Sequence, residues 1–173
     1  MDNELERCKP WEVVVMDDCG AVNLPSNVVM LHKEPRVSVL PVLGADYDEF
    51  IPIGMNLIAP AVLRQSENVS LDDVEDDIRG GGSIMWVIHV GDTLVAALTT
   101  CVVKHPQRKT LKIEFMGGSR MGEWMDDAIK YLRKIALDAG LAALEADGRK
   151  GFGKYVDNSP FREVYTHYVM ELN

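Results

Sequence analysis

The chain has 173 residues, of which 47% are hydrophobic and 26% are charged, and its formal net charge is -9 at pH 7. This length suits one domain with a single core and is too short for two domains of ordinary size. The excess of acidic side chains repels a phosphate backbone, so we expect no direct binding to nucleic acid.

No segment has the pattern of a signal peptide or of a membrane span, which predicts a soluble protein. The cysteines Cys8, Cys19 and Cys101 are odd in number, far apart and without C-x-x-C spacing, so we expect a reducing compartment and no disulfide framework. The four histidines are scattered over different segments, and no pair lies at i, i+4. We therefore predict no metal site, and expect Cys101 to be a small core residue rather than a nucleophile.

The N-terminal part differs from the rest of the chain in its pattern of apolar and turn-forming residues. Residues 1–36 alternate short apolar runs with turn-forming stretches, which indicates an extended arm or edge strands. We expect this extension to precede a domain over residues 37–173. The domain begins with a β-rich segment at 36–43, broken by Pro41, which cannot donate to a ladder and so predicts a strand at a sheet edge.

Two helical segments follow. Residues 48–65 are apolar, but three residues interrupt a continuous helix, and they are Pro52, Gly54 and Pro60. Short helical pieces are therefore expected there. Ser70, followed by acidic residues, is typical of a helix N-cap and predicts a helix that ends near Arg79, before three glycines.

Three antiparallel strands are predicted next. Residues 84–90 form an almost unbroken apolar run, as in a strand buried on both faces. Gly91 and Asp92 predict a tight turn into a second strand at 94–103. The alternating residues 110–116 predict the third.

The last part of the chain predicts a crossover. Apolar residues at helical spacing over 125–139, ended by Gly140, predict an amphipathic helix. A strand at 141–146 should lie parallel to the strand before that helix. We expect a short helix within 147–158 and a final strand at 161–172. The order of elements predicts an α/β (α+β) domain with a mixed, mostly antiparallel central sheet flanked by helices.

Two stretches resemble a known superfamily. The run W-V-I-H at 86–89 with G-D-T-L-V-A-A at 91–97 resembles a hairpin of the GNAT (N-acetyltransferase) superfamily, and A-G-L at 139–141 followed by Glu145 resembles its helix-to-fifth-strand junction. The resemblance covers roughly residues 37–173. It implies the GNAT fold and, for an active member, acetyl-CoA as the cofactor.

The resemblance also implies a site for the acetyl-CoA diphosphate, on backbone amides and a helix N-terminus after the fourth strand. The corresponding candidates are Met116, Gly117, Gly118, Ser119, Arg120 and Gly122, with Ser119 as the helix cap. The superfamily's Q/R-x-x-G-x-G/A motif is not matched here, and we expect the charge of Glu123 and the ring of Trp124 to lie close to the diphosphate position. The glycines also have a purely geometric interpretation, because a strand that turns sharply into a helix needs them. The cofactor is thus predicted to be none, or acetyl-CoA if the chain is an enzyme.

Two residues are candidates for catalysis if the chain transfers acetyl groups. Glu114 lies near the place where a GNAT enzyme has its general base, but its alternation with apolar neighbours also fits a solvent-facing strand residue. Tyr155 lies roughly where the superfamily's thiolate-protonating tyrosine occurs, and it also fits a tyrosine packed on a short helix.

Three short motifs resemble GNAT-like or internal virion proteins of tailed bacteriophages. They are Thr99-Thr100, the glycines of the fourth-strand loop with Trp124, and G-R-K-G-F at 148–152. This resemblance implies a non-catalytic structural or assembly protein of the virion, also present in the host cytoplasm. Its extension would bind other virion proteins or a second copy of the chain. The alternative is an active acetyl-CoA-dependent N-acetyltransferase of unknown acceptor, and both hypotheses stay open.

Overall fold

The structure is a computed structural model that describes residues 37–65, 68–148 and 161–164. The predicted extension, residues 1–36, lies outside the described residues, so the predicted domain boundary stays a prediction. The helices and strands are β1 (Val37–Pro41), α1 (Tyr47–Val62), α2 (Leu71–Arg79), β2 (Ser83–Val90), β3 (Thr93–Lys104), β4 (Lys109–Gly118), α3 (Met121–Asp138) and β5 (Ala143–Ala146), with single 3-10 turns at Gly44–Asp46 and Leu63–Gln65.

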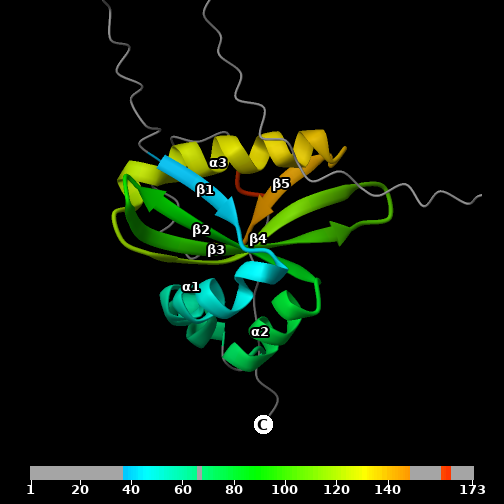
Figure 1. The fold of residues 1–173 in the computed structure, drawn as a ribbon. Helices are drawn as coiled ribbons and strands as arrows, with labels where there is room; N and C mark the ends of the chain where they lie inside the picture. Colours follow the sequence, from blue (N-terminus) through cyan, green and yellow to red (C-terminus); the bar gives the residue numbers. More distant parts are fainter. Residues whose placement is uncertain (1–36, 66–67, 149–160, 165–173) are drawn as a thin grey trace, which may run out of the picture. The chain divides into compact units, whose positions relative to one another are not determined.

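The five strands form one sheet in the order β1-β2-β3-β4-β5. The first four are antiparallel, and β5 is parallel to β4 because α3 makes the crossover between them. Helix α3 covers one face of the sheet, and α1 and α2 cover the other (Figure 1). The predicted fold class, a mixed and mostly antiparallel sheet flanked by helices, is confirmed.

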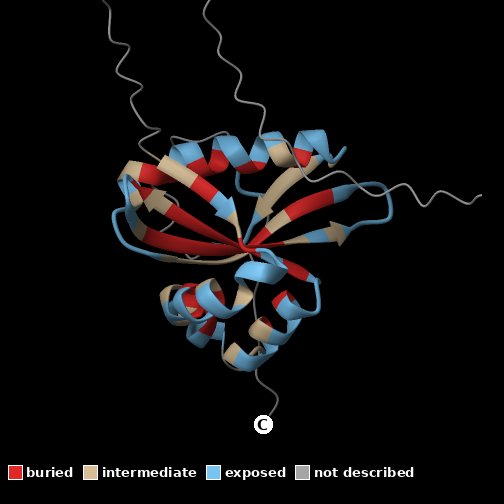
Figure 2. Cartoon of the chain, viewed as in Figure 1, coloured by how far each residue is buried: buried red, intermediate tan, exposed pale blue. Residues whose placement is uncertain are grey.

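Each face of the sheet has its own hydrophobic core. Successive side chains of a strand point to opposite faces, so β2 contributes Trp86 and Ile88 to the core under α3, and Met85 and Val87 to the core under α1 and α2. Figure 2 shows buried residues along the central strands and exposed residues on the outer surfaces of the helices. The predicted burial of this strand on both faces is therefore confirmed.

The prediction of short helical pieces at 48–65 is wrong, because α1 is one helix of 16 residues. Pro52 and Pro60 lie inside it, and both are exposed on its outer surface. The opposite surface is apolar at helical spacing and buries Ile51, Met55, Ile58 and Val62. We attribute the survival of the helix to this burial, which offsets the hydrogen bonds lost at the prolines.

The predicted helix ends are confirmed at two places. Ser70 caps α2, since its hydroxyl accepts from the Asp73 amide while the Asp73 carboxylate accepts from the Ser70 amide. Gly140 has φ of 68°, a left-handed conformation that favours glycine, and the Leu141 amide donates to the Ala136 carbonyl at 2.8 Å to close α3.

The elements expected at the C-terminus are largely untested. The helix predicted within 147–158 lies outside the described residues, except for 147–148. Of the strand predicted at 161–172, only 161–164 are described, and they form neither helix nor strand. Phe161 packs against the core under α3. No helix in the described ranges is long and apolar enough to cross a membrane.

Two glycines allow the end of β4 to pack closely on its neighbours. A side chain on Gly117 would collide with the backbone carbonyl of Leu57 in α1. Gly118 has φ of 136°, and a β-carbon there would lie 2.5 Å from the Ala96 Cα in β3. Close packing of β4 against α1 and β3 therefore requires both glycines, independently of any ligand.

We predict that Gly118→Ala lowers the free energy of unfolding by about 1–3 kcal/mol, because the residue must adopt a positive φ and displace β3. The matched control is Gly122→Ala, where a β-carbon meets nothing within 4 Å and a helical position gains up to about 1 kcal/mol. Urea denaturation followed by circular dichroism measures both. Equal stability of the two variants would contradict the packing argument.

Candidate functional site

The parallel strands β4 and β5 pair over only part of β4. Their register runs from Thr110 opposite Ala143 to Ile113 opposite Ala146, where β5 ends. Strand β4 continues for five more residues, to Gly118. Among the described residues, this second half of β4 therefore has a strand partner on one side only, which is β3.

A bulge begins where β5 ends. Leu98 lies opposite Met116 and Thr100 opposite Ile113, so β4 has two residues, Glu114 and Phe115, opposite Thr99 alone. The extra amide is satisfied by a side chain, because Thr99 Oγ1 accepts from the Phe115 nitrogen at 3.3 Å. Thr99 is fully buried. The bulge is therefore stabilised by a specific buried hydrogen bond.

Beyond the bulge, the direction of the amides follows from two hydrogen bonds. The Phe115 amide points to β3, and the Ser119 amide also does, since it donates to the Val95 carbonyl at 2.8 Å. Amides along an antiparallel ladder point alternately toward the partner strand and away from it. The amides of Met116 and Gly118 consequently point away from β3, toward the side where β5 has ended.

The N-terminus of α3 follows this open edge directly. The Glu123 amide donates to the Arg120 carbonyl at 2.9 Å, and the helix dipole makes this end of α3 positive. Arg120, in a left-handed conformation with φ of 56°, precedes the helix. Its Nε and Nη2 donate to the two carboxylate oxygens of Glu123 at 2.9 and 2.8 Å. The predicted negative charge is thus present at this end, and it is paired with Arg120.

One expectation for this loop is wrong. The N-cap of α3 is Arg120, without a side-chain cap hydrogen bond, so Ser119 is not the cap. Trp124 is only 1% exposed and packs in the core under α3, where its Nε1 donates to the Ser119 carbonyl at 2.8 Å. The ring thus packs against the sheet. The expectation that it lies close to the diphosphate position stays a prediction.

A polar cluster lies on the α1 and α2 face of the sheet beside the bulge. The Ser83 hydroxyl lies 2.7 Å from Glu114 Oε2 and 2.5 Å from Asp77 Oδ2. Ser83 is buried, Glu114 is half-buried and Asp77 is exposed. Glu114 is thus neither fully solvent-facing nor unpartnered. Burial raises the pKa of the neighbouring Cys101 thiol to about 11, and the charge of Glu114 adds to this shift.

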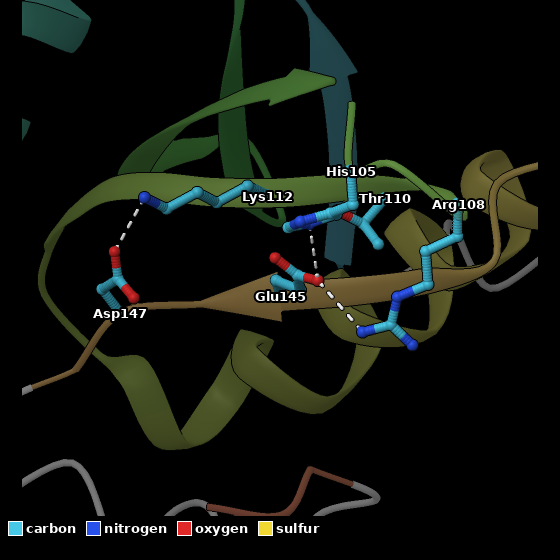
Figure 3. A network of polar contacts seen from close by, with 6 residues as sticks. All are labelled: His105, Arg108, Thr110, Lys112, Glu145 and Asp147. Atoms are coloured by element: carbon cyan, nitrogen blue, oxygen red, sulfur yellow. Dashed lines mark hydrogen bonds and ion pairs between the residues drawn. The ribbon is translucent and has the colours of Figure 1, made fainter. Parts of the chain in front are cut away.

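A second polar network links β4 and the turn before it to β5 and the residue after it (Figure 3). From the turn before β4, His105 Nε2 lies 3.2 Å and Arg108 Nη2 lies 3.4 Å from Glu145 Oε1 on β5. Lys112 Nζ lies 2.7 Å from Asp147 Oδ2, and this hydrogen bond raises the pKa of Lys112. These contacts hold the paired half of the two strands together, so that β4 and β5 separate only beyond Ile113.

The structure brings most of the predicted site residues together. Met116, Gly117, Gly118, Ser119, Arg120 and Gly122 follow one another along the open edge and the start of α3. Glu114 lies at the bulge that begins this edge. Tyr155 lies outside the described residues, so its role stays a prediction.

Sequence reasoning missed three contributors, which are Thr99 as the partner of the bulge, and Ser83 and Asp77 as partners of Glu114. Ser83 and Glu114 are 31 residues apart in the chain, and no spacing rule connects them. One sequence feature could have indicated this contact, which is the serine at the first position of a largely apolar strand. In the described ranges, no group of three or more His, Cys, Asp or Glu side chains is placed to hold a metal ion.

One cavity among the described residues lies away from this edge. It is next to β1, at the opposite edge of the sheet from β5, and its lining residues are Leu40, Pro41, Val42, Asp46, Phe50 and Val87. It contains none of the predicted site residues.

Solved structures of acetyltransferases superpose on this fold. A probable acetyltransferase gives a TM-score of 0.59 at 10% identity, over 79% of this chain and 98% of the other. The ribosomal-protein-alanine N-acetyltransferase of Brucella melitensis biovar Abortus 2308 gives 0.59 at 13% identity, over 80% and 100%. An aminoglycoside acetyltransferase from an uncultured soil metagenomic sample, solved with sisomicin, gives 0.55 at 13% identity, over 79% and 97%.

The chain has the GNAT fold. The superposition covers 98% and 100% of two of these proteins and about four fifths of this chain. At such low identity the similarity shows the fold alone. No model of a known protein family matches the sequence, and no curated protein matches it. The link to bacteriophage proteins therefore has no support from these comparisons.

We predict that Thr99→Val lowers the free energy of unfolding by about 1–3 kcal/mol, because the shape is kept while the Phe115 amide loses its acceptor. The control is Thr93→Val on the same strand, where the side chain is exposed and the expected change is within about 0.5 kcal/mol. Chemical denaturation gives both values. A loss no larger than that of the control would mean that another acceptor satisfies the bulge.

Cys101 is predicted to resist alkylation. A pKa raised from 9.0 to about 11 lowers the thiolate fraction at pH 8 by about a hundredfold, and the thiolate is the reacting species. Iodoacetamide labelling at pH 8, resolved by peptide mass spectrometry, should be slower at Cys101 than for free glutathione by about that factor. The rate should increase as the pH is raised toward 11. Labelling as fast as that of glutathione would contradict this prediction.

Proposed function

We propose that the chain binds acetyl-CoA along the open edge of β4 and transfers its acetyl group to an amine. The observation that carries this proposal is the pair of amides of Met116 and Gly118, which point away from β3 where β5 has ended. An extended ligand with its own amide groups can bind such an edge as an additional strand does. The pantetheine arm of acetyl-CoA is a ligand of this kind.

The same edge leads to a suitable position for the diphosphate. Gly118 is followed within three residues by the first residue of α3, and the dipole at this end of the helix favours an anion. Arg120 adds a positive side chain at this position. The similarity to solved acetyltransferases supports the same reaction class for this chain, and their ribosomal-protein and aminoglycoside acceptors belong to those proteins.

Glu114 is the proposed general base. An ammonium group must lose a proton before its nitrogen can attack a thioester, and a carboxylate beside the thioester can accept that proton. Glu114 lies at the bulge, and it is the first residue of β4 beyond the end of β5. Tyr155 is the proposed donor of a proton to the departing thiolate.

A second candidate function is a non-catalytic structural or assembly role in a bacteriophage virion. The pairing of Glu123 with Arg120 favours it, because this carboxylate weakens the attraction of the α3 N-terminus for an anion. In this case the extension over residues 1–36 binds other virion proteins or a second copy, and the protein occurs in the virion and the host cytoplasm. The two proposals differ in whether acetyl-CoA binds.

The test is a thermal-shift titration with acetyl-CoA on the wild-type chain and on Glu123→Gln. A ligand that binds only the native state must raise the melting temperature. Removing the charge of Glu123 should also lower the Kd by roughly two- to fivefold, because a carboxylate next to the diphosphate is lost. The matched control is Asp72→Asn, which removes a carboxylate from the first turn of α2 instead, and which should leave the Kd unchanged.

Two results would favour the structural role over the enzyme. One is the absence of any acetyl-CoA-dependent shift in the wild type and in Glu123→Gln. The other is a shift that desulfo-CoA, which lacks the thioester, reproduces while no acetyl transfer to any primary amine is detected.

A further inference from the structure

The buried hydroxyl of Ser83 lies between two carboxylates. It is 2.5 Å from Asp77 Oδ2 and 2.7 Å from Glu114 Oε2, and both distances are within the range of strong hydrogen bonds to charged acceptors. A hydroxyl has one hydrogen and two lone pairs. It can therefore donate to one carboxylate only, and it can accept a hydrogen from the other carboxyl once that group is protonated.

Three separate elements hold these groups in line. Asp77 is near the end of α2, Ser83 is the first residue of β2, and Glu114 is on β4. Gly82 makes room for this arrangement, because a β-carbon at that position would collide with the Asp77 carboxylate. The sheet fixes the other side, since Ser83 pairs with Cys101 on β3, and Cys101 pairs with Lys112 on β4.

The line of oxygens runs from the sheet to solvent. Glu114 is half-buried beside the bulge, Ser83 is 3% exposed, and Asp77 is on the exposed surface of α2. A proton taken up by Glu114 thus has a continuous hydrogen-bonded path outward through Ser83. We propose that Ser83 and Asp77 form the exit path for the proton that Glu114 removes from the amine substrate. This inference depends on the proposed acetyltransferase function.

The proton balance of the reaction requires such an exit. An ammonium substrate gives one proton to the Glu114 carboxylate, and the free nitrogen attacks the thioester carbonyl. The carbon–nitrogen bond forms, the carbon–sulfur bond breaks, and the sulfur leaves with the electron pair. The sulfur then takes the second proton that the nitrogen loses. One proton remains on Glu114, which passes it to the Ser83 oxygen while Ser83 passes its own hydrogen to Asp77, and Asp77 releases it to water.

The other titratable groups around Glu114 do not replace this path. Cys101, from β3, stays a thiol because burial and the nearby carboxylates raise its pKa to about 11. Lys112, from β4, is already hydrogen-bonded to Asp147, and this contact raises its pKa, so it stays charged. Asp77, from α2, is therefore the group through which the proton reaches solvent.

The experiment compares two acceptors with and without the exit. Asp77→Asn keeps the size and the hydrogen bonding next to Ser83, but an amide cannot take up a proton as the carboxylate does. Propylamine is charged at neutral pH and must lose a proton before it attacks, whereas hydroxylamine is already uncharged. Release of the CoA thiol from acetyl-CoA is measured with each acceptor at pH 7 and at pH 9.

We expect Asp77→Asn to lower kcat with propylamine by roughly tenfold at pH 7, and less at pH 9. This is below the ~10²–10⁴-fold that general acid–base catalysis contributes, because Glu114 itself is kept. The KM for acetyl-CoA and the rate with hydroxylamine should stay within about twofold of the wild type, because binding and acyl transfer are intact. Ser83→Ala should show the same selective loss. Added formate should restore the rate of Asp77→Ala, since the shortened side chain leaves room beside Ser83 for a small carboxylate.

The matched control is Asp76→Asn, which removes the same charge from the neighbouring exposed position of α2 and does not contact Ser83. It should behave as the wild type. Equal slowing with both acceptors, or the same loss in Asp76→Asn, would overturn the proton path and leave the acetyltransferase proposal standing. A wild-type chain that releases no thiol with either acceptor would overturn both.

Discussion

The hydrogen bond from the Phe115 amide to the Thr99 hydroxyl is the contact on which the candidate site depends. It lets β4 have one residue more than β3 without leaving the extra amide unpaired in a buried part of the sheet. The shift of one residue decides which amides point toward β3 beyond the bulge and which do not. It also places Glu114 at the start of the open edge, facing Ser83.

The two halves of β4 differ in their contacts with β5, since only the first half is paired with it. Along the paired half, Glu145 on β5 contacts His105 and Arg108, and Lys112 on β4 contacts Asp147, and the backbone pairing runs as far as Ile113 (Figure 3). Exposed ion pairs of this kind are individually weak, but they add to backbone pairing and to the burial of Leu111 and Leu144. Strand β4 is therefore paired with β5 over its first half and open on that side over its second half.

At the start of α3 the sequence does not match the diphosphate-binding motif of the GNAT superfamily. Glycines at the end of β4 are explained by close packing on α1 and β3, and the first turn of the helix contains the Arg120 and Glu123 pair. An anion at this position has to compete with Glu123 for Arg120. In the proposed acetyltransferase, the open half of β4 would bind the thioester arm, and the charge at the helix end would set how strongly the diphosphate binds.

Much of the fold follows from patterns that are local in the sequence. The apolar spacing of α3, the alternation in β4, the cap at Ser70 and the turn at Gly91 each depend on residues within one or two turns of each other, so they could be predicted one segment at a time. The order of these elements was enough to predict the mixed sheet and the parallel pair. The prolines of α1 led to the wrong prediction of short helical pieces. The hydrogen bonds that they remove are local to the helix, whereas the burial that offsets this loss comes from packing on the sheet.

The sequence by itself determined the element order, the two-sided burial of β2 and the candidate loop after β4. The tertiary structure decided which way Trp124 faces, that Ser119 is not a cap, and that Asp77, Ser83 and Glu114 meet. The physical reason is separation along the chain. A helix phase or a contact between residues 31 positions apart is fixed by how whole elements pack, and no short-range periodicity records it.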